Sequence, residues 1–294
     1  MSAPTVAGLY RYPVKSMLGE ELESSHLGPV GLLGDRALAV VDASDGTVAS
    51  AKVPAAWSGL LGLRATYTAE PRPDRPLPPV DVRFPDGSTL RSDDARIDAA
   101  LSDLLGRGVR LVSDPVEGHE FEEVWPAIEG LAPQGFIDST TVGHEADGAA
   151  RSRIGLGALV GAPSFFDLAP LHLLTRATLE QLREHAPDAT FDVRRYRPNV
   201  LVEGTDTGYA EDGWVGRTVG LGDEARVSVS MLTMRCVMTT LAQEELPADP
   251  DTLRTIARHH RREIPGLGTW ACAGVYADTA AAGTVRVGDP VTVG

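Results

Sequence analysis

Glycine and proline recur along the whole chain and divide it into short segments. The 294 residues contain 31 Gly and 21 Pro. Because these residues form turns and interrupt helices, the sequence predicts short elements joined by frequent turns rather than long helices. A chain of this length can form one large domain or two of ordinary size. We expect two closely packed units.

Alternating apolar and polar residues predict strands in several of these segments. The strongest turn signal is Asp86-Gly87, which predicts a tight hairpin, and residues 43–46 predict a second turn. Between these two hairpins, the proline-rich stretch 68–79 predicts a surface loop. The segments expected to form strands are 5–14, 36–50, 80–92, 197–204, 225–232 and 283–293.

Helical periodicity is limited to a few segments, so strands are expected to dominate. Residues 93–107, 171–187 and 249–262 predict helices, the last with Asp249 as its N-terminal cap. The segment 117–152 is irregular, and we place the junction between the two units there. The expected class is a β-rich α+β fold with a few helices laid around the strands.

The charge balance limits the partners that the surface can attract. The chain has 27 Lys and Arg against 41 Asp and Glu, which gives a net charge of −14. Such a surface opposes general electrostatic binding to nucleic acid or to an anionic membrane. Any anion that the protein binds must therefore be held by a local cluster of basic groups.

Cysteine content and the N-terminal sequence indicate the cellular compartment. Two cysteines in the whole chain make no disulfide framework, which favours the reducing cytoplasm. The first residues lack the basic flank and long apolar core of a signal peptide. No apolar run approaches the roughly 20 residues needed to span a bilayer. We therefore expect a cytoplasmic protein.

Cys236 lies in the stretch MLTMRCVMTT, beside Arg235 and just after an expected strand. A thiol acts as nucleophile or metal ligand in its thiolate form, and a neighbouring cation lowers its pKa towards that form. A lone cysteine is also often a small buried residue, so the pattern leaves both interpretations open. Cys272 lies among small and aromatic residues typical of a buried strand, and neither cysteine has the spacing of a zinc site.

Basic residues are concentrated in the stretch FDVRRYRPNV, although the chain is acidic overall. Alternation along an expected strand would place Arg195 and Arg197 on one side, followed by Asn199, as a shelf for an anion. Lys15 of YPVKS and Arg36 of GDR gain meaning only if they converge on the same ligand. The histidines, including His172 and those in RHHRRE, favour structural roles.

Six motifs occur in the order found in the MOSC family, the proteins with a molybdenum cofactor sulfurase C-terminal domain. They are YPVKS, GDR, FDLAP, RYRPNV, RCVMTT and GTVRVGDPV, and they cover nearly the whole chain. Within the family the chain resembles the amidoxime-reducing members and their bacterial relatives. The resemblance implies an N-terminal β-barrel domain in residues 1–118, packed on a MOSC β-barrel domain with peripheral helices in residues 119–294.

The resemblance implies a molybdenum–molybdopterin cofactor. Its metal is held by the pterin dithiolene, oxo groups and one protein thiolate, which here matches Cys236. The family motif RPN matches Arg197, Pro198 and Asn199, and implies contacts from the first and third of these to the phosphate and pterin. The residues that the resemblance assigns to the cofactor are Lys15, Ser16, Arg36, Asp167, Arg197, Asn199, Arg235 and Cys236.

The implied activity is removal of an oxygen atom from an N-hydroxylated or N-oxygenated small molecule, with Cys236 as the catalytic metal ligand. The chain stops at Gly294 with no further cysteine, so electrons are expected from a separate ferredoxin-, flavoprotein- or cytochrome-type partner. Family descriptions also carry a pyridoxal phosphate binding term. Two alternatives stay open: transfer of sulfur carried as a persulfide on Cys236, and a cofactor carrier without turnover.

Departures from the family pattern lie close to the expected site. Leu168 and Ala169 follow Asp167 where the related proteins have hydroxyl residues, which alters the expected cofactor contacts there. Met234 stands before the Arg-Cys pair where small polar residues are common. This exchange is expected to change the substrate side of the metal.

Overall fold

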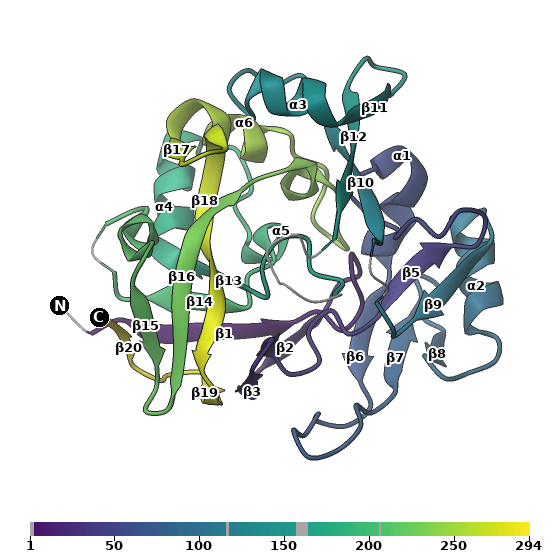
Figure 1. Cartoon of the computed structure of the whole chain (residues 1–294), viewed down its shortest axis with the longest axis horizontal. Helices are drawn as coiled ribbons and strands as arrows, with labels where there is room; N and C mark the ends of the chain where they lie inside the picture. The colour runs from purple at the N-terminus through teal and green to yellow at the C-terminus, as the bar shows by residue number, and fades with distance from the viewer. Residues whose placement is uncertain (1–2, 116–117, 157–163, 206) are drawn as a thin grey trace.

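The computed structural model describes residues 3–115, 118–156, 164–205 and 207–294 (Figure 1). The first half contains β1 (Thr5–Arg11), β2 (Glu20–Leu22), β3 (Ser24–Gly28), β4 (Gly31–Leu32), β5 (Ala39–Asp42), α1 (Pro54–Trp57), η1 (Ser58–Gly62), β6 (Arg64–Tyr67), β7 (Val80–Arg83), β8 (Thr89–Arg91), α2 (Ile97–Leu105), β9 (Val109–Val112), β10 (Glu120–Trp125), α3 (Gln134–Thr140) and β11 (Thr141–His144).

The second half begins with β12 (Ala150–Gly155), β13 (Leu171–Thr175), α4 (Arg176–His185), α5 (Val193–Tyr196) and β14 (Val200–Glu203). It continues with η2 (Ala210–Trp214), β15 (Thr218–Leu221), β16 (Ala225–Met234), η3 (Val237–Thr240), α6 (Asp251–His259), β17 (Arg261–Ile264), β18 (Gly268–Ala281), β19 (Gly283–Arg286) and β20 (Val291–Val293). The predicted β-rich α+β class is therefore confirmed.

The largest sheet joins the two ends of the chain. Its strand order is β2-β1-β14-β13-β18-β16-β15-β20, and β17 pairs with β18 beside this path. β13 and β14 run parallel, whereas the other neighbours in the sheet are antiparallel. Among the described residues the strands form several sheets and no closed barrel is found, although a bridge between Thr5 and Pro290 also links β1 to the segment just before β20.

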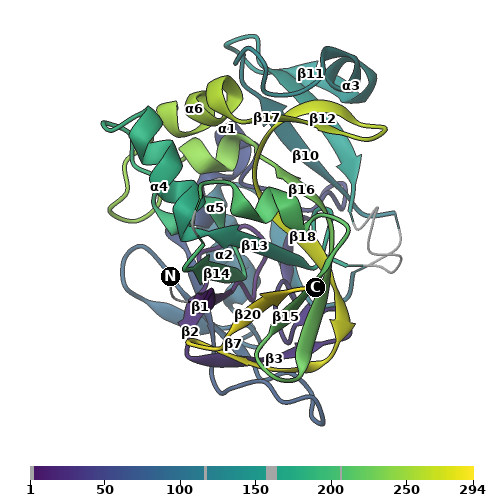
Figure 2. The ribbon, with the colours of Figure 1, turned by 90° about the vertical axis from the view of Figure 1, so that its left-hand side faces the viewer.

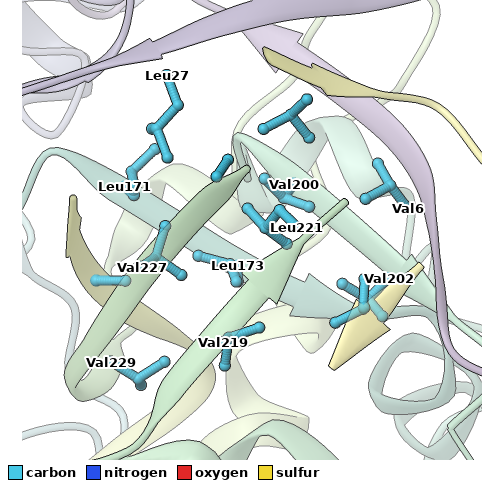
Figure 3. Packing of buried hydrophobic residues seen from close by; sticks show 14 of the residues in the cluster. Val6, Leu27, Leu171, Leu173, Val200, Val202, Val219, Leu221, Val227 and Val229 are labelled. Atoms are coloured by element: carbon cyan, nitrogen blue, oxygen red, sulfur yellow. The ribbon is translucent and has the colours of Figure 1, made fainter. Parts of the chain in front are cut away.

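Apolar side chains cover both faces of this sheet. On one face, valines and leucines from β1, β3, β13, β14, β15 and β16 converge into a continuous core, and Figure 3 labels ten of them. On the other face, leucines of α4 and the buried face of α6 pack against the sheet. Figure 2 shows these two helices side by side. The sheet is therefore a fixed frame for the residues that project from its strand ends.

A second group of elements packs beside the large sheet (Figure 1). It contains the antiparallel pair β5-β9, the three-stranded sheet β6-β7-β8 and helix α2, around a separate apolar core. The three-stranded sheet β10-β12-β11 contributes to the cores of both groups. Its Val124 belongs to this second core, and its Trp125 belongs to the core under α4 and α6. The predicted boundary between two domains at residues 118 and 119 stays a prediction. Strands from both sides of it pair in one sheet, as β1 does with β14.

Most of the predicted local structure is confirmed. The Asp86-Gly87 turn joins β7 and β8, and Gly87 has a φ of 86° that suits glycine. The helix predicted in 93–107 is α2, and it ends at Gly106 in the left-handed conformation. The helix predicted in 249–262 is α6; Asp249 accepts a hydrogen bond from the Asp251 amide, although the first cap position falls on Pro250.

The helix predicted over 171–187 is correct only in its second part. Residues Leu171–Thr175 form the strand β13, and all five are buried. A strand buried on both faces between two neighbours needs a continuous apolar run, which periodicity alone does not distinguish from a helix. The helix begins at Arg176, where the Thr175 hydroxyl accepts a hydrogen bond from the Thr178 amide.

Two further predictions are wrong. The strand predicted over 197–204 is present as β14, but it does not extend back to Arg195: residues 193–196 form the short helix α5, which Asp192 caps and Arg197 ends with a φ of 53°. The segment predicted to be irregular contains β10, α3, β11 and the first half of β12. Within the described ranges, no helix has the length and apolar character needed to cross a membrane.

A buried carboxyl group joins β13 to η2 and should affect stability with pH. Glu211 is fully buried and accepts hydrogen bonds from the hydroxyls of Thr175 at 2.7 Å and Thr178 at 2.8 Å. Burial raises the pKa of Glu211 above its ordinary value of 4.5, and these hydrogen bonds oppose the shift only in part.

Because the folded state then holds a proton that the unfolded state releases, stability from this group is lost as pH rises from about 4.5 through the raised pKa. We expect the unfolding free energy of the wild type, relative to Glu211→Gln, to fall across this range by about 1.4 kcal/mol for each unit of raised pKa. Urea unfolding of both proteins at several pH values measures the difference. A difference independent of pH contradicts the prediction.

Candidate functional site

A polar pocket lies where the N-terminal loops meet β13, β16 and β18. It holds about 720 Å³ of space, counting its open mouth. We call it the basic pocket, because five cationic side chains line it. The lining residues are Lys15, Ser16, Arg36, Lys52, Asp167, Leu168, Ala169, His172, Tyr196, Arg197, Thr233, Met234, Arg235, Cys236, Met238 and Tyr276.

The fold brings together residues that are far apart in the sequence. Of the eight residues predicted to bind a cofactor, seven line the basic pocket, and Asn199 does not. Their predicted roles towards a cofactor stay predictions. The seven are Lys15, Ser16, Arg36, Asp167, Arg197, Arg235 and Cys236.

The backbone of three lining residues is left-handed. Ser16, Arg36 and Arg197 have φ values of 65°, 48° and 53°. Residues other than glycine adopt this conformation at a cost, and such residues concentrate at functional sites. Only Tyr209 and Glu244 share it among the other non-glycine residues that the structure describes. The strained positions therefore gather around this pocket.

Two of the arginines, Arg36 and Arg197, pack against the ring of Tyr12. The guanidinium carbons of Arg197 and Arg36 lie 4.1 Å and 4.9 Å from the centre of its ring. Its hydroxyl donates a hydrogen bond to the carbonyl of Pro198 at 3.2 Å, and burial raises the pKa of this hydroxyl. An aromatic face beside two cations stabilises both and fixes their directions.

Asn199 organises the frame of the pocket instead of lining it. Its side-chain oxygen accepts a hydrogen bond from the His172 amide at 3.1 Å, and its nitrogen donates to Asp35 at 3.0 Å. Asp35 also accepts from the Tyr12 amide at 2.7 Å and pairs with Arg36. Asn199 therefore joins β1, β13 and the Arg36 loop from outside the pocket lining, and its expected contact with a cofactor stays a prediction.

Two lysines share the carboxylate of Asp167. Lys15 pairs with one of its oxygens, and Lys52 lies 3.1 Å from the other. Burial would raise the pKa of Asp167, but the two cations outweigh burial and hold it far below its usual value. Burial lowers the pKa of Lys15, and Asp167 counteracts this only in part. Both ammonium groups also face the ring of Phe121.

Lys52 and Glu123 are residues that the sequence patterns did not identify. Lys52 Nζ lies 2.7 Å from a carboxylate oxygen of Glu123, and both side chains are buried. Burial would lower the pKa of Lys52, but Asp167 and Glu123 outweigh it and raise the pKa well above its usual value. Neither residue belongs to a recognisable motif, so only their buried pairing could have revealed them.

Cys236 lies at the turn that follows β16. Its carbonyl accepts hydrogen bonds from the Thr239 amide at 3.3 Å and hydroxyl at 3.2 Å, and the Thr240 hydroxyl donates to Val237 at 2.7 Å. The two threonines of the RCVMTT motif thus hold the turn that presents the thiol. Burial raises the pKa of the Cys236 thiol, and the nearby Lys52 and Arg235 lower it less. Arg235 thus lowers the pKa of the thiol as expected, but burial outweighs it and the pKa is raised overall.

The arginine cluster divides between the pocket and other surfaces. Arg195 donates hydrogen bonds to the carbonyls of Leu241 at 2.9 Å and Pro247 at 2.6 Å, away from the pocket lining. Arg194 pairs with acidic side chains at 2.9 Å and 2.6 Å. The predicted shelf of Arg195 and Arg197 is therefore wrong, because the helix α5 turns these side chains in different directions.

His172 lines the pocket, although its sequence context favoured a purely structural role. Burial, and then the charge of Arg235, lowers its pKa well below the usual value, which keeps the ring neutral. Gly274 makes room for this ring: a Cβ there would lie 2.3 Å from His172 Nε2. The left-handed φ of 85° at Gly274 serves the same close approach.

Several buried polar atoms of the lining have no partner within the described part of the chain. They are Nη1 of Arg197, Nε of Arg235, the hydroxyls of Thr233 and Tyr196, and Nε2 of His172. Unpaired buried donors are costly, so they indicate a ligand that accepts hydrogen bonds. Burial also lowers the pKa of Arg197 to about 10, and no carboxylate pairs with it among the recorded ion pairs of the described residues. The donors fit an anionic group that carries phosphate.

Cys272 matches the predicted buried position. It lies in β18 with no exposed surface and belongs to the core under α4 and α6. Within the described ranges, no group of three or more His, Cys, Asp or Glu side chains could hold a metal ion. A metal at Cys236 would therefore need most of its ligands from a bound group.

Comparisons with known proteins identify two family regions. Residues 161–292 match the MOSC domain, and residues 3–58 match the MOSC N-terminal beta barrel domain. A search of the curated proteins finds no match. Among solved structures, the YuaD protein from Bacillus subtilis is 11% identical with a TM-score of 0.46, over 99% of this chain and 96% of that chain. YiiM from Geobacillus stearothermophilus is 17% identical with a TM-score of 0.31, over 42% and 54% of the two chains.

The unpaired donor of Arg197 leads to a test with inorganic phosphate. We expect Arg197→Gln to bind phosphate about tenfold or more weakly, because a hydrogen bond to a charged group contributes ~1.5–3 kcal/mol. The rise of Tm with phosphate concentration reports the affinity through mass action. Arg194→Gln is the control, since Arg194 lies in α5, the helix that Arg197 ends, and outside the pocket lining. Equal weakening in both variants contradicts a specific role for Arg197.

Proposed function

Because the chain belongs to the MOSC proteins and carries the MOSC N-terminal beta barrel domain, we propose that it binds a molybdenum cofactor in the basic pocket. We further propose that it is an enzyme that reduces N-hydroxylated or N-oxygenated small molecules. The observation that carries this proposal is the gathering of cations and unpaired buried donors around the thiol of Cys236.

The basic pocket supplies what a phosphorylated pterin needs. Arg36 and Arg197 lie over the ring of Tyr12 and would bind the phosphate, with Lys15 beside them. Arg235 has a free Nε, and its Nη2 is fixed by the carbonyl of Tyr196 at 3.0 Å. These residues would bind and orient the group.

Cys236 is the proposed protein ligand of the metal. A thiolate is a suitable ligand for a metal that also carries dithiolene sulfur. When bound, the cofactor would supply the two-electron redox chemistry by which the oxygen of the substrate is removed. The net reaction takes up two electrons and two protons and releases water with the reduced nitrogen compound.

Lys52 is the proposed proton-bearing group beside the reaction. Its Nζ keeps its proton, since the carboxylates of Asp167 and Glu123 raise its pKa well above the usual value. From this position it can donate a hydrogen bond to an oxygen bound near the Cys236 thiol. Electrons are proposed to come from a separate ferredoxin-, flavoprotein- or cytochrome-type protein. An iron–sulfur cluster needs several cysteines, and the one cysteine besides Cys236 in this sequence, Cys272, lies buried in a strand.

The test compares two cysteine variants made in a host that supplies the cofactor. We expect Cys236→Ala to reduce both the molybdenum content and the reductase activity at least about tenfold. Changes to residues that merely support a metal ligand already cost about that much, and Cys236 is the proposed ligand itself. Cys272→Ala should keep both and lose ~1 kcal/mol of stability, as is common for buried substitutions. Metal and pterin content, and reduction of an amidoxime with a chemical electron donor, measure the effects.

Other outcomes of the same experiment separate the alternatives. Wild-type protein without stoichiometric molybdenum overturns the proposed function. Mass spectrometry that finds a persulfide on Cys236, with no bound pterin, supports sulfur transfer instead. Bound pterin without reduction of any N-hydroxylated compound supports a carrier.

A further inference from the structure

A second cavity adjoins the basic pocket at Cys236. Its cavity volume is about 250 Å³, which leaves room for a ligand of about one aromatic ring and a short polar group. We call it the aromatic chamber. The walls that it does not share with the basic pocket are Phe121, Glu123, Trp125, Phe136, Ile154, Leu267 and Trp270.

Three rings form a rigid wall of the chamber. Phe136 and Trp270 pack edge to face with centres 4.9 Å apart, and Trp125 lies 5.8 Å and 5.7 Å from them. The indole nitrogen of Trp125 donates to the Ser152 hydroxyl at 2.9 Å, and that of Trp270 donates to the Leu267 carbonyl at 2.8 Å. Because both polar groups of these indoles are satisfied, the surface left for a ligand is apolar.

The polar groups of the chamber lie near the wall that it shares with the basic pocket. Lys52, Arg235 and Cys236 line both cavities. Glu123 lies on the chamber side and pairs with Lys52 at 2.7 Å. A ligand in the chamber thus meets aromatic side chains around its body and charged groups at the end close to the thiol.

The two unusual residues of this chain also lie in the shared wall. Leu168 and Met234 line both cavities, and both are partly buried. In the related proteins, hydroxyl or small polar residues stand at these two positions. Their apolar side chains extend the apolar surface of the chamber up to Cys236.

We propose that the aromatic chamber is the substrate site and that it selects small molecules with a planar aromatic body and an N-hydroxylated polar end. The body packs against Trp125, Phe136 and Trp270, and the polar end reaches Lys52 and Cys236. This inference rests on the proposed function, which supplies the reaction at the polar end, but binding in the chamber can be measured without turnover.

The probes share one polar end and differ in their body. Benzamidoxime has an aromatic ring, acetamidoxime has a methyl group, and hexanamidoxime has a flexible aliphatic chain. Calorimetric titration of cofactor-loaded protein without an electron donor measures binding alone. We expect benzamidoxime to bind at least about tenfold more tightly than acetamidoxime, which corresponds to about 1.4 kcal/mol, and also more tightly than hexanamidoxime.

The variants change the chamber without touching the basic pocket. Leu267 lines the chamber and is 41% exposed, so Leu267→Trp can fill the space without disturbing the core. It should weaken benzamidoxime binding about tenfold and raise the KM for this compound with little change in kcat. Leu104→Trp, at a 38% exposed position of α2 outside both linings, is the control and should bind as the wild type does. Phe136→Ala provides a second variant, which removes one ring of the wall.

Failure of the chamber and failure of the proposed function give different results. Equal affinity for benzamidoxime and acetamidoxime, or benzamidoxime binding that neither Leu267→Trp nor Phe136→Ala weakens, overturns the chamber. Equal affinity for hexanamidoxime overturns selection for an aromatic body. If benzamidoxime binds in the chamber but molybdenum-loaded protein reduces none of the probes, the chamber stands and the proposed reduction is overturned.

Discussion

The pairing of β1 with β14 is the constraint on which the basic pocket depends. It aligns Leu9 with Val200 and continues through the hydrogen bond between the Tyr10 amide and the carbonyl of Asn199 at 2.9 Å. Tyr12 follows directly after β1, and Arg197 precedes β14, so the pairing places the ring under the guanidinium. Residues almost two hundred positions apart in the sequence therefore meet because their strands are neighbours in one sheet.

The pocket concentrates positive charge within a protein that is acidic overall. A buried cation is costly unless its charge is balanced, and the site uses two solutions. Lys15 and Lys52 share Asp167 and Lys52 also pairs with Glu123, so two carboxylates balance the two ammonium charges within the protein. Arg197 has an aromatic face and an unpaired nitrogen, so its balance depends on a ligand. The lysines are therefore neutralised by the protein itself, whereas the free donor of Arg197 is left for a ligand.

Motif order predicted more of the pocket than periodicity did. The residues Lys15, Arg36 and Cys236 were identified because each belongs to a short motif, and their convergence follows from strand pairing. Periodicity assigned the hairpins and α2, where local signals decide the structure. It misassigned β13, because a strand buried on both faces shows no alternation. Lys52 and Glu123 could not be predicted, because their pairing arises only when the turn before α1 packs against β10.

Cys236 lies between two cavities of opposite character, and two residues of the wall that they share, Leu168 and Met234, depart from the family pattern. One cavity is lined by cations that suit a phosphorylated group, and the other is lined by aromatic rings that exclude water. A reaction that removes oxygen from nitrogen benefits when the reacting atoms are shielded from bulk water, since fixed charges then act more strongly. Under the proposed function, the apolar side chains of Leu168 and Met234, which line both cavities, would provide this shielding. Polar residues there would admit water beside the thiol and weaken the effect of Lys52 on a bound oxygen.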